Sequence, residues 1–404
     1  MLQSYLTVIR RYPNIIALGV MATLFSNFGQ TFFIGLYNEH FRSLFDLSST
    51  AFGSIYSGVT VCSAITLLFI GHFIDKISLH RYITIICLSL AAGCMLIYWA
   101  PALPLFILGL GLVRFLGQGV MTHLSSTVTA RYVKEGRGKG LSLASLGISL
   151  GGAFFPLMAT ASDAALGWRT SWLVYGVLYL FLVLPIMLKL APKRNIELPD
   201  ELEDTLHPNA SVKTVLRDPT FWAVIITGML LPFLMTGIFF HQRFIMDSLG
   251  YSQTLYASLF VLFGATGMIA SFVVGALVDK LGSDWMLRVY LIPFLLAIWL
   301  LMSISHPLAL AAWMVATAIS ASCFHPAQGS FLAERYGTKR LGALKSVLTS
   351  SIVLSSAIAP ALFGYLIDTT ANVMVLLHVS WITTAIILFG INWQLRRSAT
   401  IARN

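Results

Sequence analysis

Apolar runs of about twenty residues alternate with short polar segments along the whole chain. A helix needs about 20 mostly apolar residues to cross the hydrocarbon core of a bilayer, so each run is long enough to span it. The predicted fold class is therefore all-α, with twelve transmembrane helices. We expect them at residues 14–37, 50–74, 79–99, 105–129, 140–163, 168–190, 219–242, 254–278, 286–304, 308–332, 342–367 and 373–395.

A longer polar stretch separates the sixth run from the seventh. It covers residues 193–217, contains Glu197, Asp200, Glu201, Glu203 and Asp204, and shows no apolar periodicity. Such a stretch is typical of a linker. The predicted organisation is an N-terminal six-helix bundle over residues 1–191, a cytoplasmic linker over 192–217 and a C-terminal six-helix bundle over 218–404.

The two predicted bundles carry the same motif at corresponding places. GHFIDKISLHR begins at Gly71, and GALVDKLG begins at Gly275, 204 positions later. The same offset relates Arg131 to Arg335, and the register holds over about ninety residues. Duplicated halves of a membrane protein commonly enclose one site between them. The sequence thus predicts two pseudo-symmetric halves.

Composition supports the membrane assignment, because only 10% of the residues are charged against about 25% in soluble proteins. With the N-terminus inside, 22 of the 26 Lys and Arg residues fall on the inner side. Basic residues are enriched in cytoplasmic loops. We therefore expect an integral protein of an inner or plasma membrane with both termini cytoplasmic. The net charge of +10 follows from this topology, and no basic cluster with interleaved aromatics predicts a nucleic-acid partner.

The repeated motif resembles the loop between helices two and three of the major facilitator superfamily, Gly-x-Leu-x-Asp-Arg-x-Gly-Arg-Lys. The resemblance implies a secondary transporter whose two six-helix halves rock about a central site. It also implies a gating set at the inner surface. A carboxylate there is stabilised by a helix N-terminus, so we expect Asp75 near Arg131 or the start of helix eleven, and Asp279 near Arg335 or the start of helix five. The full gating set is Gly71, Asp75, Lys76, Arg131, Gly275, Asp279, Lys280 and Arg335.

Three further stretches narrow the resemblance. RFLGQGVMTHLSSTVTARY, GRGKGLSLASLGISLGGAFFP and GWRTSW are similar to the branch that contains monocarboxylate and oxalate/formate carriers. Residues 147–156 lack the Gly-Pro-x-x-Gly-Gly order of the superfamily's drug antiporters, which makes an export function less favoured. The monocarboxylate and oxalate/formate branch often holds a carboxylate with an arginine on helix eight, and residues 254–278 contain no arginine.

Arg114 is the one charge expected at the membrane midplane, about ten residues below the outer end of helix four. A buried charge there costs at least about 2.5 kcal/mol, so it must face water, a partner or a ligand. Its surroundings, LVRFLGQG, resemble the superfamily's helix-four motif, except that Gln118 and Gly119 arrive one residue later. Two interpretations stay open. Arg114 is either a counter-ion for an anionic solute or a structural donor to carbonyls between helices.

Polar residues at helical spacing accompany this arginine. By resemblance, helices one, four, seven and ten line the central cavity, and each carries a polar stripe on one face. The candidate solute-binding residues are Arg114, Gln118, Asn27, Gln30, Thr31, Thr236, Phe240, Phe324 and Gln328.

None of the sixteen acidic residues falls at the predicted midplane, so a deep carboxylate relay for protons is not expected. Histidine titrates near neutral pH and is the alternative proton carrier. The coupling candidates are His123, His241 and His325. The four cysteines lie inside the predicted spans without metal-ligand spacing. We expect no metal and no cofactor.

No phosphate-binding loop or catalytic constellation is present, so we predict a gradient-driven carrier and not an enzyme. The leading hypothesis is alternating-access transport of a small organic anion, with protons as candidate coupling ion and the carrier working as a monomer in the bilayer. One alternative is an exporter of amphipathic compounds, suggested by the aromatic and methionine residues of helix seven. Another is a non-transporting receptor on a carrier fold.

Overall fold

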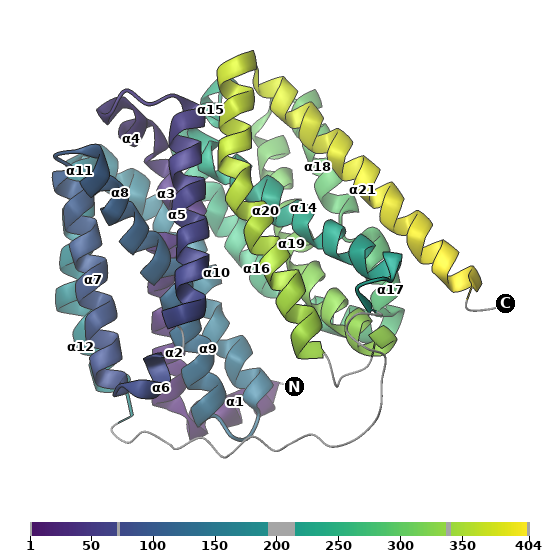
Figure 1. Cartoon of the computed structure of the whole chain (residues 1–404), viewed down its shortest axis with the longest axis horizontal. Coiled ribbons are helices and arrows are strands. Elements are labelled where there is room, and N and C mark those ends of the chain that lie inside the picture. Colours follow the sequence, from purple (N-terminus) through teal and green to yellow (C-terminus); the bar gives the residue numbers. More distant parts are fainter. Residues whose placement is uncertain (1, 71–72, 193–214, 337–340, 402–404) are drawn as a thin grey trace. The chain divides into compact units, whose positions relative to one another are not determined.

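The structure is a computed structural model that describes residues 2–70, 73–192, 215–336 and 341–401. These residues form helices and contain no strand, which confirms the all-α prediction (Figure 1). Twelve of the helical segments are long and apolar enough to cross a membrane. The predicted linker lies largely outside the described residues.

The helices follow one another in chain order. In the first half they are α1 (Leu2–Arg11), α2 (Pro13–Phe25), η1 (Ser26–Gly29), α3 (Thr31–Leu36), α4 (Asn38–Leu44), α5 (Ser49–Ile70), α6 (Phe73–Lys76), α7 (Leu79–Trp99), α8 (Leu103–Leu112), η2 (Val113–Met121), α9 (Thr122–Tyr132), α10 (Arg137–Leu166), α11 (Trp168–Leu178), η3 (Tyr179–Val183) and α12 (Leu184–Leu190). In the second half they are α14 (Pro219–Phe240), α15 (Gln242–Ser248), α16 (Gln253–Leu281), α17 (Ser283–Val289), α18 (Ile292–Ser303), α19 (Pro307–Tyr336), α20 (Leu341–Thr370) and α21 (Val373–Ile401).

The chain divides into two compact units. Unit 1 comprises Met1–Leu47 and Ile55–Glu201, and unit 2 comprises Ser48–Ser54 and Leu202–Asn404. The first residues of α5 therefore belong to unit 2, whereas the rest of that helix belongs to unit 1. The polar stretch predicted a division at the linker, and no sequence pattern indicated this exchange.

In unit 1, α2 lies against α10 with almost no side chain between them. Gly147 and Gly151 make this approach possible. A Cβ on Gly147 would lie 2.2 Å from the Thr23 hydroxyl oxygen, and one on Gly151 would lie 2.1 Å from the Asn27 side-chain nitrogen. Small residues let membrane helices approach closely and pack their backbones together. The Asn27 amide lies in this contact and donates to the Gly147 carbonyl at 3.4 Å.

An aromatic cluster fills the middle of unit 1. The Phe28 ring lies 4.7 Å from Phe155 and 4.9 Å from Tyr175, measured between ring centroids. Ring pairs at such separations contribute beyond their buried area. The cluster therefore fixes the part of helix one around Phe28 against α10 and α11.

In unit 2, α14 packs along α20, and α16 packs along α19. Two glycines of α14 accept large rings from these neighbours. A Cβ on Gly228 would lie 2.1 Å from the Phe324 ring, and one on Gly237 would lie 2.5 Å from the Phe363 ring. α21 packs along both α14 and α18.

The start of α5 is held by the end of α20, inside unit 2. The backbone N–H groups of Ser49 and Thr50 donate to the Asp368 carboxylate at 3.0 and 2.7 Å. Gly364 lets the backbones of α20 and α5 come into contact, because a Cβ there would lie 2.3 Å from the Ser49 carbonyl oxygen. A carboxylate at a helix N-terminus satisfies donors that have no partner within the helix.

We expect Asp368→Ala to destabilise the folded protein by about 1 kcal/mol, the usual cost of losing a helix cap. The melting temperature of the purified protein in detergent measures this. Thr369→Ala is the matched control, because its hydroxyl donates only within α20, to Tyr365 and Leu366. Equal melting temperatures for the two variants would show that the cap contributes nothing.

Candidate functional site

Helix one is broken in the middle, where the sequence predicted a continuous helix over residues 14–37. α2 ends at Phe25, Ser26–Gly29 form a tight 3₁₀ turn, and Gln30 is extended with ψ of 148° before α3 begins. Irregular backbone within a membrane is tolerated where other groups satisfy its carbonyls and N–H groups. The predicted span agrees with the apolar stretch Pro13–Leu36, which is long enough to cross a membrane. The break inside it was not predicted, because a hydropathy window averages over it.

The segment opposite the break is π-helical. Helix four consists of α8, the π-helical η2 and α9, and η2 packs on η1. π-helical turns hold an additional residue per turn and recur at functional sites. η2 contains Arg114, Gln118 and Gly119, the residues of the motif in which Gln-Gly arrives one position late.

Gly29 and Gly117 bring the two segments into backbone contact. A Cβ on Gly29 would lie 2.5 Å from the Val113 carbonyl oxygen and 2.7 Å from the Gln118 nitrogen. A Cβ on Gly117 would lie 2.9 Å from the Gly29 Cα. Neither position has room for a side chain.

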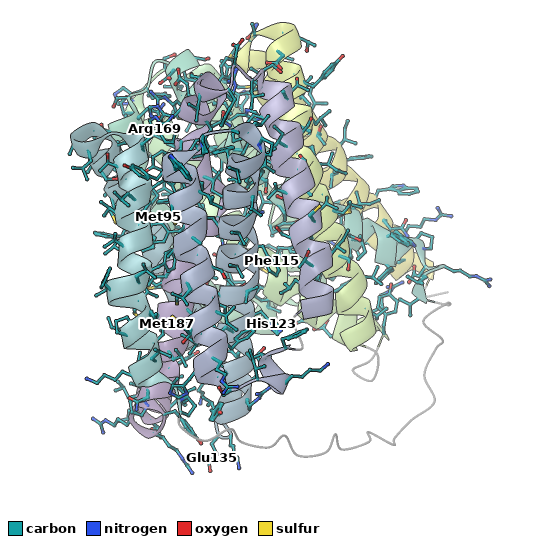
Figure 2. All side chains as sticks on the ribbon, turned by 60° about the vertical axis from the view of Figure 1, so that its left-hand side comes forward. Met95, Phe115, His123, Glu135, Arg169 and Met187 are labelled. Carbon is teal, nitrogen blue, oxygen red and sulfur yellow. The ribbon has the colours of Figure 1, made fainter. Side chains whose placement is uncertain are left out.

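Arg114 lies at this crossing and is buried, with 4% of its surface exposed. Its Nη1 donates to the Gly29 carbonyl at 3.0 Å, and its Nε donates to the Thr60 hydroxyl at 3.3 Å. The guanidinium carbon lies 5.2 Å from the centre of the Tyr56 ring. Figure 2 labels the adjacent Phe115, which lies about midway between Arg169 at one end of unit 1 and Glu135 at the other.

The partners of Arg114 are all uncharged. No carboxylate forms an ion pair with it in the part of the chain that the structure describes. The Tyr56 hydroxyl in turn donates to the Thr31 hydroxyl at 3.0 Å, which extends the network to α3. A buried cation is thus surrounded by a carbonyl, hydroxyls and an aromatic ring.

Tyr56 and Thr60 are residues of this site that were not predicted from the sequence. They lie four residues apart on α5, so they share one face of that helix. This spacing was visible in the sequence. Because only helices one, four, seven and ten were expected to line the cavity, α5 supplied no candidates.

The other candidates of unit 1 take different positions. Asn27 is fully buried and donates to carbonyls of α2 as well as to Gly147, so its amide ties helix one to α10. Thr31 joins the Arg114 network through Tyr56. Gln30 follows the break directly, Gln118 lies within η2, and both are half-buried.

The candidates of unit 2 lie on α14 and α19. Phe324 packs on Gly228 and on the Tyr290 ring, 5.5 Å away. Phe240 stacks on Phe52 at 5.2 Å. Gln328 is 2% exposed and its side-chain nitrogen has no hydrogen-bond acceptor among the described residues, whereas Thr236 is half-buried.

Two of the three candidate coupling histidines have described contacts. Nε2 of His241 lies 2.8 Å from the Pro360 carbonyl, and this ring is almost fully buried. Nδ1 of His123 lies 3.2 Å from the Thr127 hydroxyl. The side chain of His325 lies outside the described part of the structure.

Of the gating residues, Arg335 has a partner that the repeat did not predict. Its Nε donates to the Asp218 carboxylate at 3.3 Å, and its Nη2 donates to the Thr220 hydroxyl at 3.4 Å. Asp218 directly precedes α14 and accepts from the Thr220 backbone N–H at 2.8 Å. The expected partner was Asp279, whose side chain is not described.

The remaining gating residues are placed only in part. Gly71 and the side chain of Asp75 lie outside the described structure, and Gly275 lies within α16. Lys76 and Lys280 are exposed, and the Lys76 ammonium lies 5.7 Å from the Phe73 ring centre. Arg131 is half-buried near the end of α9.

The Asp218 carboxylate gives the N-terminal end of α14 a pH-dependent contact. Its burial would raise the pKa, but hydrogen bonds from Thr220 and Tyr336 and the charge of Arg335 outweigh this and lower the pKa of Asp218 from its usual value. A carboxylate with a lowered pKa stabilises the fold at pH above its unfolded value, and this stabilisation is lost as pH falls through the folded value.

We therefore expect Asp218→Asn to lower the melting temperature at pH 7, and we expect this difference from wild type to shrink as the pH falls through the lowered pKa of Asp218. Melting of both proteins between pH 7 and 3 checks this. Asp247→Asn is the control, because its exposed carboxylate accepts from the Gln253 side chain. A difference between Asp218→Asn and the wild type that already disappeared at a pH above the usual pKa of an aspartate would contradict the assignment.

The sequence matches the profile of the Major Facilitator Superfamily over residues 17–242 and 233–399. These segments cover nearly the whole chain, so the protein belongs to that superfamily. Its fold is that of a secondary transporter and not of an enzyme. Comparison with curated proteins finds no significant match.

Three solved structures illustrate the likeness. A bacterial homolog of the human lysosomal transporter Spinster, inward-facing and unoccupied, aligns with a TM-score of 0.68 and 16% identity over 97% of this chain and 98% of that one. Its occupied form gives a TM-score of 0.69 and 16% identity over 97% of both chains. A mutant of the nucleoside transporter NupG gives 0.72 and 10% identity over 94% and 99%. At these identities the likeness concerns the fold alone.

Proposed function

We propose that this carrier moves a small organic anion by alternating access and that Arg114 supplies the charge that recognises it. The observation that carries the proposal is a buried guanidinium whose described partners are all neutral. A charge in the membrane interior is costly and marks solute or ion pathways. An anionic group would replace contacts with uncharged acceptors by an ion pair.

The geometry of arginine suits a carboxylate. A guanidinium offers five N–H donors in a planar fork. Two of these donors have described acceptors, the Gly29 carbonyl and the Thr60 hydroxyl. A carboxylate arriving at the fork would form two parallel hydrogen bonds between oppositely charged groups, which are stronger than hydrogen bonds from the same guanidinium to uncharged acceptors.

The contacts of Arg114 also suggest how solute binding would act on α5. Thr60 and Tyr56 lie on α5, whose first residues belong to unit 2 and are held by Asp368. If a carboxylate displaces the Thr60 hydroxyl from Arg114, α5 loses one of its contacts to helix four. Solute binding would then favour one arrangement of α5 over another, as a ligand with differential affinity must.

The amphipathic-exporter alternative was suggested by the aromatic and methionine residues of helix seven, and two of those aromatic rings have packing partners. Phe239 packs with Phe260 and Trp313, and Phe240 packs with Phe52. Both rings are buried, so packing within unit 2 accounts for this part of the aromatic content of helix seven.

A thermal-shift screen of purified protein tests the proposal. We expect short-chain carboxylates to raise the melting temperature of the wild type and their uncharged amides to have no effect. The same carboxylates should not stabilise Arg114→Gln. Stabilisation of wild type and variant alike by neutral nucleosides or amphipathic cations would overturn the assignment of an anionic solute.

A further inference from the structure

A histidine and an aspartate meet at the end of unit 1 that the sequence predicts to face outward. Nε2 of His40 on α4 lies 2.9 Å from the Asp163 carboxylate on α10, and each side chain is 27% exposed. The His40 ring stacks on Trp168, with 6.0 Å between centroids and 19° between planes. The pair joins helix one, helix five and the start of helix six.

Asp163 occupies an unfavourable place for a negative charge. It lies in the last turn of α10, where its own carbonyl accepts from the Gly167 N–H. The C-terminal end of a helix carries partial negative charge and disfavours a carboxylate. Asp163 is therefore stabilised when its partner His40 is protonated.

The other charged side chains near the pair either contact backbone carbonyls or are exposed. On α11, Arg169 lies over the Trp168 ring and donates to the Tyr98 and Trp99 carbonyls. On α4, Arg42 donates to the Leu47 carbonyl, and Glu39 is exposed. The described contacts thus give Asp163 one cationic partner, His40.

A chain of hydroxyls adjoins the pair. The Ser162 and Tyr175 hydroxyls lie 2.5 Å apart, and those of Tyr175 and Tyr37 lie 2.7 Å apart. Both tyrosines are about 1% exposed. Tyr37 directly precedes α4, so the network fixes the position from which His40 projects.

The pair is also linked along the chain to the Arg114 site. The six residues of α3 separate the break at Gln30 from Tyr37. Thr31, the first residue of α3, belongs to the Arg114 network through Tyr56. Only α3 separates α4 from the break beside Gly29.

We propose that His40 and Asp163 form a proton-binding site that couples transport to a proton gradient. One proton converts neutral His40 to imidazolium, and the net charge of the pair changes from −1 to 0. Proton binding tightens the contact between α4 and α10, and proton release loosens it. The coupling role rests on the proposed transport function, whereas proton binding does not.

Trp168 provides a direct test in purified wild-type protein, without any solute. A protonated imidazole quenches indole fluorescence more strongly than a neutral one. We expect the difference in fluorescence between wild type and Trp168→Phe to fall sigmoidally between pH 8 and 5. His40→Gln should abolish the transition. His378→Gln is the matched control, because that exposed ring lies on α21 in unit 2.

Asp163→Asn gives a second test that retains the titrating group. Asp163→Asn removes the carboxylate that lies 2.9 Å from Nε2 of His40, so the Trp168 transition should change in this variant while the imidazole is retained. A flat Trp168 signal from pH 8 to 5, or a transition that persists in His40→Gln, would overturn the proton site.

Proteoliposomes containing pyranine test the coupling. The probe is the monocarboxylate that gives the largest thermal shift, added outside at pH 6 with pH 7.5 inside. Wild type should accumulate it and acidify the lumen, whereas His40→Gln should only equilibrate it. Normal accumulation by His40→Gln would overturn the coupling role. If wild type moves no carboxylate, the proposed function and the coupling role fail, and the fluorescence titration still decides the proton site.

Discussion

In Arg114→Gln, uptake of the carried anion is expected to fall by about a hundredfold or more while the protein stays folded and inserted. Removing one partner of a buried charge pair costs about 2–5 kcal/mol of binding free energy. The neutral amide loses both the charge and the fork of donors. Arg114→Lys should retain part of the activity, because it keeps the charge but not the two-pronged geometry.

Initial uptake rates in proteoliposomes, corrected for the amount of folded protein, measure this effect. Thr60→Val is the matched control: it removes one acceptor of the Arg114 Nε and leaves the charge in place. We expect that variant to transport within about tenfold of wild type. A correctly inserted Arg114→Gln protein with normal rate and affinity would show that Arg114 only ties Gly29 and Thr60 together.

The second large effect is expected at the backbone crossing of helices one and four. Gly29→Ala places a methyl group 2.5 Å from the Val113 carbonyl oxygen and 2.7 Å from the Gln118 nitrogen. Both obstacles are backbone atoms, so no side-chain rotation relieves the clash. Overpacking typically costs about 1–3 kcal/mol, and for a clash with backbone on this scale we expect about 3 kcal/mol or more.

Yield and melting temperature of the detergent-purified protein measure this loss. Gly111→Ala is the control, because that helical glycine lies on α8 just before η2 and a Cβ there would meet nothing within 4 Å. Alanine there should be neutral or slightly stabilising, since it has a higher helix propensity than glycine. Equal melting temperatures for Gly29→Ala and Gly111→Ala would contradict the close backbone contact between helices one and four.

The twelve spans could be predicted because a bilayer requires one continuous property, about twenty apolar residues in a row. That property is local and visible in the sequence. The break at Gln30 and the π-helical turn at Arg114 are not visible there, since both occur inside apolar runs of ordinary length. They arise from tertiary contacts, above all the approach of Gly29 to Gly117.

Side-chain partners were harder to predict than helices. The repeat suggested that Arg131 and Arg335 have equivalent partners, yet Asp218, the partner of Arg335, corresponds to Asn14 at the 204-residue offset. In the first half, the ion pair near the end of α9 joins Arg11 to Glu135 instead. A repeat preserves the backbone plan, whereas individual charges diverge between the copies.

His40 and Asp163 show a second reason for missed contacts. Each lies near a predicted span end, where a polar residue needs no explanation, and 123 positions separate them. Only the packing of α4 against α10 brings them together. The sequence therefore favoured histidines within the spans as proton carriers. One of them is His241, whose ring lies against the Pro360 carbonyl.

The central claim is that the carrier recognises negative charge at Arg114. The most direct measurement compares uptake of a short-chain carboxylic acid and of its amide, equal in size and shape, by wild-type proteoliposomes with no pH gradient. We expect saturable uptake of the acid, competition by other carboxylates and no uptake of the amide above empty vesicles. Saturable uptake of the amide at the same rate as the acid would contradict the central claim.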